Sequence, residues 1–309
     1  MPRQAVAHPS SSVPVPNDVH QHVRTLFGTC NARTSEKLTN APNIPEQSLD
    51  LTWIEHFSTY AVPVRLTSGW SVIVRTHYLG GMRHFRNWEI ADIGLLLFIR
   101  RRDGSTQSKV ALLQSKRLYP TNHNVAEETR SDYEIGFARL ADPEDLARSI
   151  ALATNYSFDD ACQYGALIAG SEQVDAIRGY ELSSTLRVYY QLYNPWRVPL
   201  SVNIPLAAYQ RFDGLPELGT RIVTASDLHD RLAPEADGYR PSLRDLSSLL
   251  PSYGWRLEEF ASDLFLGCSE GTPFDTLDED RIQSMFYRRS GAISAAVSFV
   301  IEEGEGRRE

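Results

Sequence analysis

The sequence is poor in cysteine and has no long apolar run. Its three cysteines, Cys30, Cys162 and Cys268, lie too far apart for a CxxC zinc knuckle or a dense disulfide framework. No apolar stretch approaches the roughly 20 residues that span a bilayer, and the N-terminus lacks a charged start followed by a hydrophobic segment. We therefore expect reduced thiols, no membrane association and a cytoplasmic location.

Excess positive charge and phosphate-binding loops are also missing. The formal net charge is -8 at pH 7, which argues against a protein that coats nucleic acid through its global charge. Neither GxGxxG nor GxxxxGK[ST] occurs, which argues against dehydrogenase and NTPase functions. Because the net charge is negative, any contact with nucleic acid must be local. Hydrophobic residues make up 42% of the chain, enough for a packed core.

Composition divides the chain into three regions. Residues 1–45 are rich in Pro, Ser and Asn and lack sustained periodicity, which predicts a flexible N-terminal arm. Residues 46–204 carry helix and strand patterns and are expected to form one α/β domain. Residues 205–309 predict a mainly helical C-terminal part packed on that domain.

Within the middle region, the apolar spacing of Leu51 and Ile54 predicts a helix over residues 48–60. Two strand-like runs flank an Asp103-Gly104 turn signal and are apolar on both faces, so we expect central strands joined in a hairpin. The expected strands are 71–77, 90–100, 109–117, 186–192 and 198–204, the last continuing the sheet. The expected later helices are 143–153, 159–169, 241–250, 255–266 and 278–289.

The hairpin carries the residues that suggest chemistry. Asp92 and the pair Gln114 and Lys116 are equidistant from the turn, so they should meet across the two strands. A carboxylate, an amide and an ammonium rarely share a buried sheet position unless they are paired or bind a metal. Mg²⁺ prefers one or two protein oxygens together with water and phosphate oxygens, and a nearby lysine can polarise the attacking water. This set predicts phosphodiester hydrolysis.

An aspartate followed on the next strand by (D/E/Q)-x-K resembles the PD-(D/E)XK nuclease superfamily, whose core runs αβββαβ. The resemblance covers about residues 46–200 and implies an α/β fold with a mixed central sheet. It implies that Asp92, Gln114 and Lys116 are catalytic, that Glu55 on the first helix joins them, and that Mg²⁺ or Mn²⁺ is bound by Asp92, Gln114 and Glu55. Some family members add a glutamine on a later helix. The resemblance implies that Gln163 is this residue and that it contacts the nucleic acid.

Two residues depart from the family pattern. Ala91 replaces the usual proline, and Gln114 replaces the usual glutamate. The amide oxygen can coordinate a metal but carries no charge, so we expect weaker metal affinity. Besides Gln163, the expected phosphate contacts are Arg83, Arg86 and Arg117.

The expected function is a metal-dependent nuclease acting on DNA or RNA. By resemblance, such a domain serves as an effector in bacterial restriction or antiphage defence, together with a partner protein that senses the invader. The sequence leaves the oligomeric state open, including a homo-oligomer. The alternative is an inactive nuclease-like protein that binds nucleic acid or acts as a scaffold.

Overall fold

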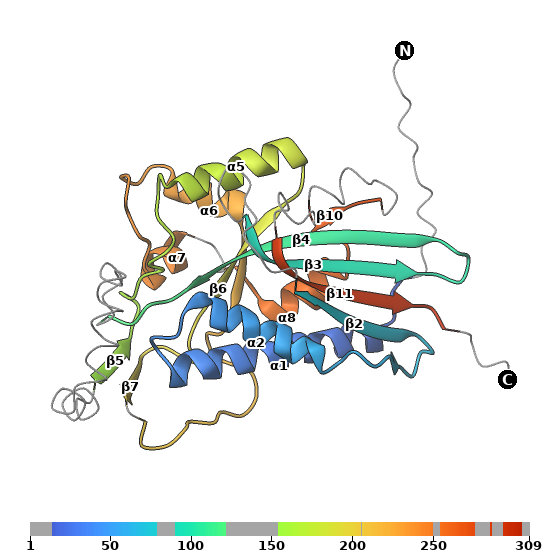
Figure 1. Cartoon of the computed structure of the whole chain (residues 1–309), viewed down its shortest axis with the longest axis horizontal. Coiled ribbons are helices and arrows are strands. Elements are labelled where there is room, and N and C mark those ends of the chain that lie inside the picture. Colours follow the sequence, from blue (N-terminus) through green and yellow to red (C-terminus); the bar gives the residue numbers. More distant parts are fainter. Residues whose placement is uncertain are drawn as a thin grey trace, which may run out of the picture.

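The computed structural model describes residues 14–78, 90–121, 154–204, 206–249, 254–275, 285 and 293–304. These residues form a mixed α/β protein with one large mixed sheet and helices on both of its faces (Figure 1). The helices are α1 (Asn17–Asn40), α2 (Glu46–Ser58), α5 (Glu172–Ser184), α6 (Ala225–Leu232), α7 (Leu243–Leu249), α8 (Leu257–Glu259) and the π-helix η1 (Phe260–Phe265). The expected α/β class with a mixed central sheet is confirmed.

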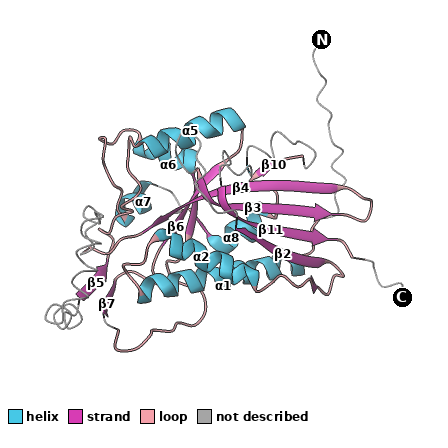
Figure 2. Cartoon of the chain, viewed as in Figure 1, coloured by secondary structure: helices cyan, strands magenta, loops and turns pink. Residues whose placement is uncertain are grey.

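The sheet has the strand order β1-β2-β11-β3-β4-β6-β8-β9, with β10 paired to β4. Figure 2 shows the neighbouring strands β2, β11, β3 and β4. Its strands are β1 (Val64–Arg65), β2 (Ser71–Tyr78), β3 (Ala91–Arg100), β4 (Thr106–Arg117), β6 (Val188–Tyr193), β8 (Arg221–Thr224), β9 (Trp255–Arg256), β10 (Thr272–Pro273) and β11 (Ile293–Glu302). The pairs β11–β3 and β4–β6 are parallel, and the other pairs are antiparallel. The sheet is therefore mixed at its centre.

The β3–β4 hairpin has the predicted register. Ile93 lies opposite Leu113 and Arg100 opposite Thr106. Gly104 closes the turn with φ +83°, a conformation that glycine adopts without steric cost. Both strands are buried over most of their length, as expected for apolar runs in the middle of a covered sheet.

The expected flexible arm over residues 1–45 is wrong for Asn17–Asn40, which form α1. This helix packs against α2, α8 and η1, and its buried side includes polar residues such as Asn31 and Thr34. Asn31 donates to Glu258 at 2.8 Å and accepts from the Thr220 N–H at 2.7 Å. Long-range partners thus satisfy the polar residues that share the buried side of α1 with apolar residues such as Val23 and Phe27.

The predicted helix at 48–60 is confirmed as α2, but its buried face differs from the expected one. Leu49, Trp53 and Phe57 are fully buried, whereas Leu51 is 47% exposed. Phe57 packs on Phe299 of β11, so α2 covers the same sheet face as α1. Figure 1 shows α1 and α2 together on one side of the sheet, with α5 and α6 on the other.

Other predicted elements differ from the structure. Residues 159–169 form turns and an isolated bridge between Gln163 and Ser242 in place of a helix, and the helix follows as α5. The strand at 198–204 is found as β7 (Leu200–Ile204), but it pairs with β5 (Thr154–Phe158) in a separate two-stranded sheet. The helix expected at 143–153 lies outside the described residues, as does nearly all of that at 278–289.

The helices expected at 241–250 and 255–266 are found as α7 and as α8 with η1, but the described residues of the C-terminal part are not mainly helical. It supplies β8, β9, β10 and β11, and β11 lies between β2 and β3 in the middle of the sheet. An insertion of this kind requires pairings between residues some two hundred positions apart, which local patterns do not encode. None of the helices in the described ranges is both long and apolar enough to cross a membrane.

Candidate active site

The candidate site lies where β4 extends beyond the start of β3. The pairing of the two strands ends with Ile93 opposite Leu113, whereas β4 continues to Arg117 along β6. The backbone N–H of Ser115 donates to Asp92 Oδ2 at 2.7 Å. A side-chain carboxylate thus takes the place of a strand partner at this end of the sheet.

Glu46, in the first turn of α2, occupies the next position along this gap. Its Oε1 accepts from the backbone N–H of Arg117 at 3.1 Å, and its Oε2 lies 3.7 Å from Lys116 Nζ. Lys116 is only 3% exposed, and the Glu46 carboxylate offsets part of the cost of burying its ammonium.

Asp50, one turn further along α2, lies beside Asp92. The Ser115 hydroxyl donates to Asp50 Oδ1 at 2.5 Å, while the Ser115 N–H binds Asp92. The Tyr193 hydroxyl donates to the same Asp50 oxygen at 2.8 Å. A single residue, Ser115, therefore holds two carboxylates together.

Gln114 completes the group, which we call the hairpin cluster: Glu46, Asp50, Asp92, Gln114 and Lys116. Gln114 Nε2 donates to Asp92 Oδ2 at 2.7 Å. This leaves Gln114 Oε1 buried without a hydrogen-bond partner. A buried carbonyl oxygen in that state costs free energy unless a cation or donor reaches it.

The electrostatics of the cluster favour an added positive charge. Burial raises the pKa of Asp92 to about 6, although Lys116 and the Ser115 N–H oppose the rise. Burial, followed by the Asp92 charge, raises the pKa of Asp50 well above its ordinary value. Three carboxylates thus share one ammonium, and a divalent cation would relieve their repulsion.

These residues fit a hard divalent cation. The donors are carboxylate and amide oxygens, which Mg²⁺ and Mn²⁺ accept. Within the described part of the chain, no group of three His, Cys, Asp or Glu side chains is arranged to hold a metal by itself. A bound ion would therefore be held by Asp92, Asp50 and Gln114 Oε1 and completed by water and substrate oxygens, as is usual for Mg²⁺.

Three of the predicted site residues, Asp92, Gln114 and Lys116, come together as expected. Glu55 does not join them: its side chain is exposed on α2, and the carboxylates of that helix that reach the cluster are Glu46 and Asp50. The reason is the rotation of the helix, because the buried face runs through Leu49 and not through Leu51.

The residues expected to contact nucleic acid do not lie together at the site in the described part of the chain. Arg117 is 1% exposed, donates from Nη1 to the Pro42 carbonyl at 2.7 Å and stacks on Tyr119 at 3.9 Å, so that prediction is wrong. Gln163 lies in the isolated bridge rather than on a helix, and its carbonyl accepts from the Tyr119 N–H. Arg83 and Arg86 lie outside the described residues.

Sequence reasoning missed the two carboxylates of α2 and the buried network behind them. Glu46 and Asp50 are four residues apart, the spacing that places two side chains on one helix face, and this signal was available. Gln191 donates to the Tyr193 hydroxyl, which in turn donates to Asp50. The link from β6 to α2 depends on tertiary packing and leaves no local pattern.

The chain was compared with protein-family models, curated proteins and solved structures. No family model matches it, and no curated protein or solved structure matches it significantly. The geometry of the hairpin cluster is therefore the basis for any functional proposal.

Proposed function

We propose that this chain is a divalent-metal-dependent nuclease that hydrolyses phosphodiester bonds of DNA or RNA at the hairpin cluster. One observation carries the proposal: carboxylates from α2 and β3, an unpartnered buried amide oxygen and a buried lysine converge at the end of one hairpin. Phosphoryl transfer uses oxygen ligands and a cation side by side, because its transition state gathers negative charge beside an attacking water.

Each residue then has a distinct task. Asp92 and Asp50 supply anionic oxygens, and Gln114 Oε1 supplies a neutral one. A bound Mg²⁺ or Mn²⁺ ion supplies Lewis-acid polarisation of the phosphate and lowers the pKa of a water. Lys116 Nζ orients the attacking water and offsets charge on the phosphate, and Glu46 positions that ammonium from 3.7 Å.

The order of elements also supports the proposal. A helix (α2), three strands (β2, β3, β4), a further helix (α5) and a strand parallel to β4 (β6) follow one another as in the αβββαβ core that the sequence resembles. The inserted β11 departs from a simple β2-β3-β4 meander. The carboxylate positions on α2 and the hairpin are unaffected by this insertion, since β11 pairs on the far side of β3 from β4.

The test is incubation of the purified chain with plasmid, single-stranded DNA and RNA, with and without Mn²⁺. We expect cleavage of at least one substrate in Mn²⁺ and none in EDTA. Asp92→Asn and Lys116→Met serve as site variants, and Glu55→Gln on the exposed side of α2 as the matched control. Metal-induced stabilisation without cleavage of any substrate would instead support the inactive binding protein.

A further inference from the structure

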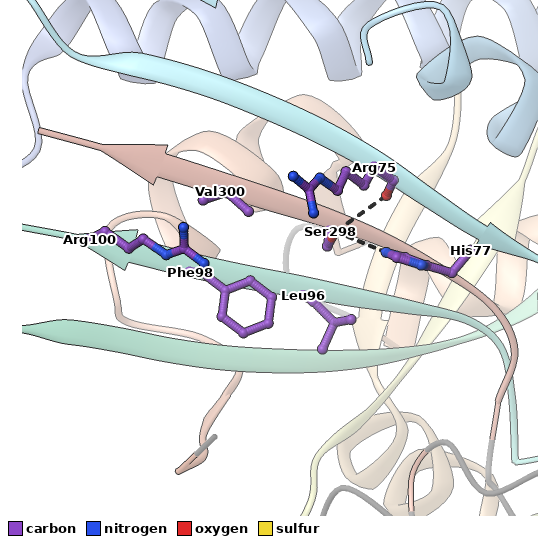
Figure 3. A pocket seen from close by; sticks show the side chains of 7 residues that line it. All are labelled: Arg75, His77, Leu96, Phe98, Arg100, Ser298 and Val300. Carbon is purple, nitrogen blue, oxygen red and sulfur yellow. Dashed lines mark hydrogen bonds between the residues drawn. The ribbon is translucent and has the colours of Figure 1, made fainter. Parts of the chain in front are cut away.

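A groove of about 410 Å³ crosses β2, β11 and β3 (Figure 3). Its apolar wall consists of Leu96, Phe98 and Val300. Arg75 lies at the same groove with an exposed side chain, whereas Arg100 is paired with Glu302 at 2.9 Å. An apolar surface beside an exposed cation is suited to a ligand that is flat and apolar on one side and anionic on the other.

Ring packing and hydrogen bonds hold the residues that line the groove. Phe274 packs against the Phe98 ring at 5.9 Å and an interplanar angle of 79°, which fixes the orientation of that ring. The Ser298 hydroxyl contacts His77 Nε2 at 3.2 Å, and it donates to the Arg75 carbonyl at 3.4 Å (Figure 3). These contacts tie β2 to β11 beneath the groove.

The groove lies on the same sheet face as Asp92. Side chains alternate along a strand, so Asp92, Leu96 and Phe98 of β3 point to one side. In the register, Leu96 is beside Ser298 and Phe98 beside Val300, which brings β11 into the same surface. Asp92 and Leu96 are four residues apart, which corresponds to about 13 Å along the strand. This is close enough for one nucleic-acid strand to reach both.

We propose that the groove binds an unpaired nucleotide of the substrate, so that the nuclease acts on single-stranded nucleic acid or on an unpaired end. The inference rests on the proposed function. The base stacks on Phe98 over Leu96 and Val300, and a phosphate that flanks it contacts Arg75. In a duplex, each base is stacked on its neighbours, so its face is not available to an aromatic side chain.

The net charge of the whole chain agrees with this arrangement. Because the chain carries -8, attraction to phosphate must come from local cations rather than from the overall field. Aromatic stacking tolerates any base, so little sequence preference is expected at this position. The groove would thus distinguish unpaired from paired nucleic acid, while the hairpin cluster performs the hydrolysis.

Binding is measured by fluorescence anisotropy in EDTA, with a short fluorescein-labelled single-stranded DNA and the same sequence as a duplex. EDTA prevents metal-dependent cleavage, so the full-length chain can be used. We expect tighter binding of the single strand, and a loss of roughly tenfold for Phe98→Leu, which keeps an apolar side chain but removes the ring. Arg75→Gln should weaken binding severalfold and reduce its salt dependence.

Two substitutions in the exposed loop between β7 and β8 provide matched controls. Tyr209→Leu removes an aromatic ring that is 53% exposed, and Arg211→Gln removes an exposed guanidinium beside it. Neither should change the affinity. Phe98→Tyr, which retains the ring, should retain most of the affinity for the single strand.

The outcomes separate the groove from the active site. Equal affinity for duplex and single strand, or unchanged binding by folded Phe98→Leu and Arg75→Gln chains, would overturn the groove assignment. Asp92→Asn should still bind the single strand in EDTA, since that residue lies outside the groove. A chain that binds through Phe98 and Arg75 yet cleaves no substrate in Mn²⁺ supports the groove and overturns the nuclease proposal.

Discussion

Replacing Asp92 by asparagine should stabilise the metal-free protein at neutral pH and remove its response to metal. Asparagine is nearly isosteric and retains an oxygen that can accept from Gln114 Nε2 and the Ser115 N–H, now at 2.7 Å each. What disappears is a buried negative charge beside Asp50. The two effects have opposite signs, so they can be told apart.

The magnitude follows from the pKa of Asp92. Its folded-state pKa of about 6 lies above the 3.8 of an unperturbed aspartate, so the folded state binds the proton more tightly than the unfolded state. Stability from this group is therefore fully present below about pH 4 and is lost as the pH rises through about 6. The difference amounts to about 3 kcal/mol at most.

The assay is thermal unfolding in EDTA at pH 4 and pH 7.5, and again at pH 7.5 with Mn²⁺. At pH 4 the wild-type and Asp92→Asn chains should melt at nearly the same temperature, because the carboxyl is protonated in the folded state and still partly protonated in the unfolded state. At pH 7.5 the variant should melt higher, by about 2 °C for each kcal/mol. Metal at a hundredfold excess over Kd should stabilise the wild-type chain by about 2.7 kcal/mol and so raise its melting temperature, and it should leave the variant nearly unchanged.

The exposed Asp213 provides the matched control, since Asp213→Asn makes the same chemical change outside any cluster. It should alter neither melting curve. A variant Asp92→Asn that is less stable than wild type at pH 7.5 and still responds to metal would refute the reasoning. Asp92 would then be a structural hydrogen-bond acceptor, and the metal ligands would lie elsewhere.

The remaining predictions concern the other members of the hairpin cluster. Lys116→Met should abolish cleavage in a nuclease assay yet keep the metal-induced rise in melting temperature, because it removes a charge and fills the buried space; continued cleavage would contradict the site. Gln114→Glu should tighten metal binding in calorimetry, since it adds a charge at an oxygen that lacks a partner, and cleavage should survive. Weaker binding by a folded Gln114→Glu chain would count against this ligand role. Glu46→Gln should lower the cleavage rate by about tenfold through the loss of a partner for Lys116, whereas Glu55→Gln should leave it unchanged; equal rates for Glu46→Gln and wild type would assign Glu46 to packing alone.

The hairpin could be predicted because its information is local. The Asp103-Gly104 turn fixes the register, and the register brings Asp92 opposite Gln114. The same argument could not identify the correct side of α2, because Leu51 and Leu49 are both apolar and only the tertiary structure buries Leu49. Once the face of that helix was misjudged, Glu55 was the natural but wrong choice.

The elements that could not be predicted depend on distant partners. The side of α1 that faces the protein is partly polar, with Asn31 bound to Glu258 more than two hundred residues away. The apolar run that forms β11 has a recognisable strand pattern, yet nothing near it indicates insertion between β2 and β3. The same holds for the site network, in which Tyr193 of β6 reaches Asp50 of α2.

The central position of β11 sets an order for the synthesis of this protein. On the ribosome, β2, β3 and β4 emerge long before residues 293–302, and the gap between β2 and β3 stays open until those residues arrive. A nascent chain or a chain cut before Ile293 would hold two facing strand edges with unpaired N–H and C=O groups, which invite pairing with other chains. The solubility of the nascent chain therefore depends on β11, and termination before Ile293 should produce aggregation rather than a shortened folded protein.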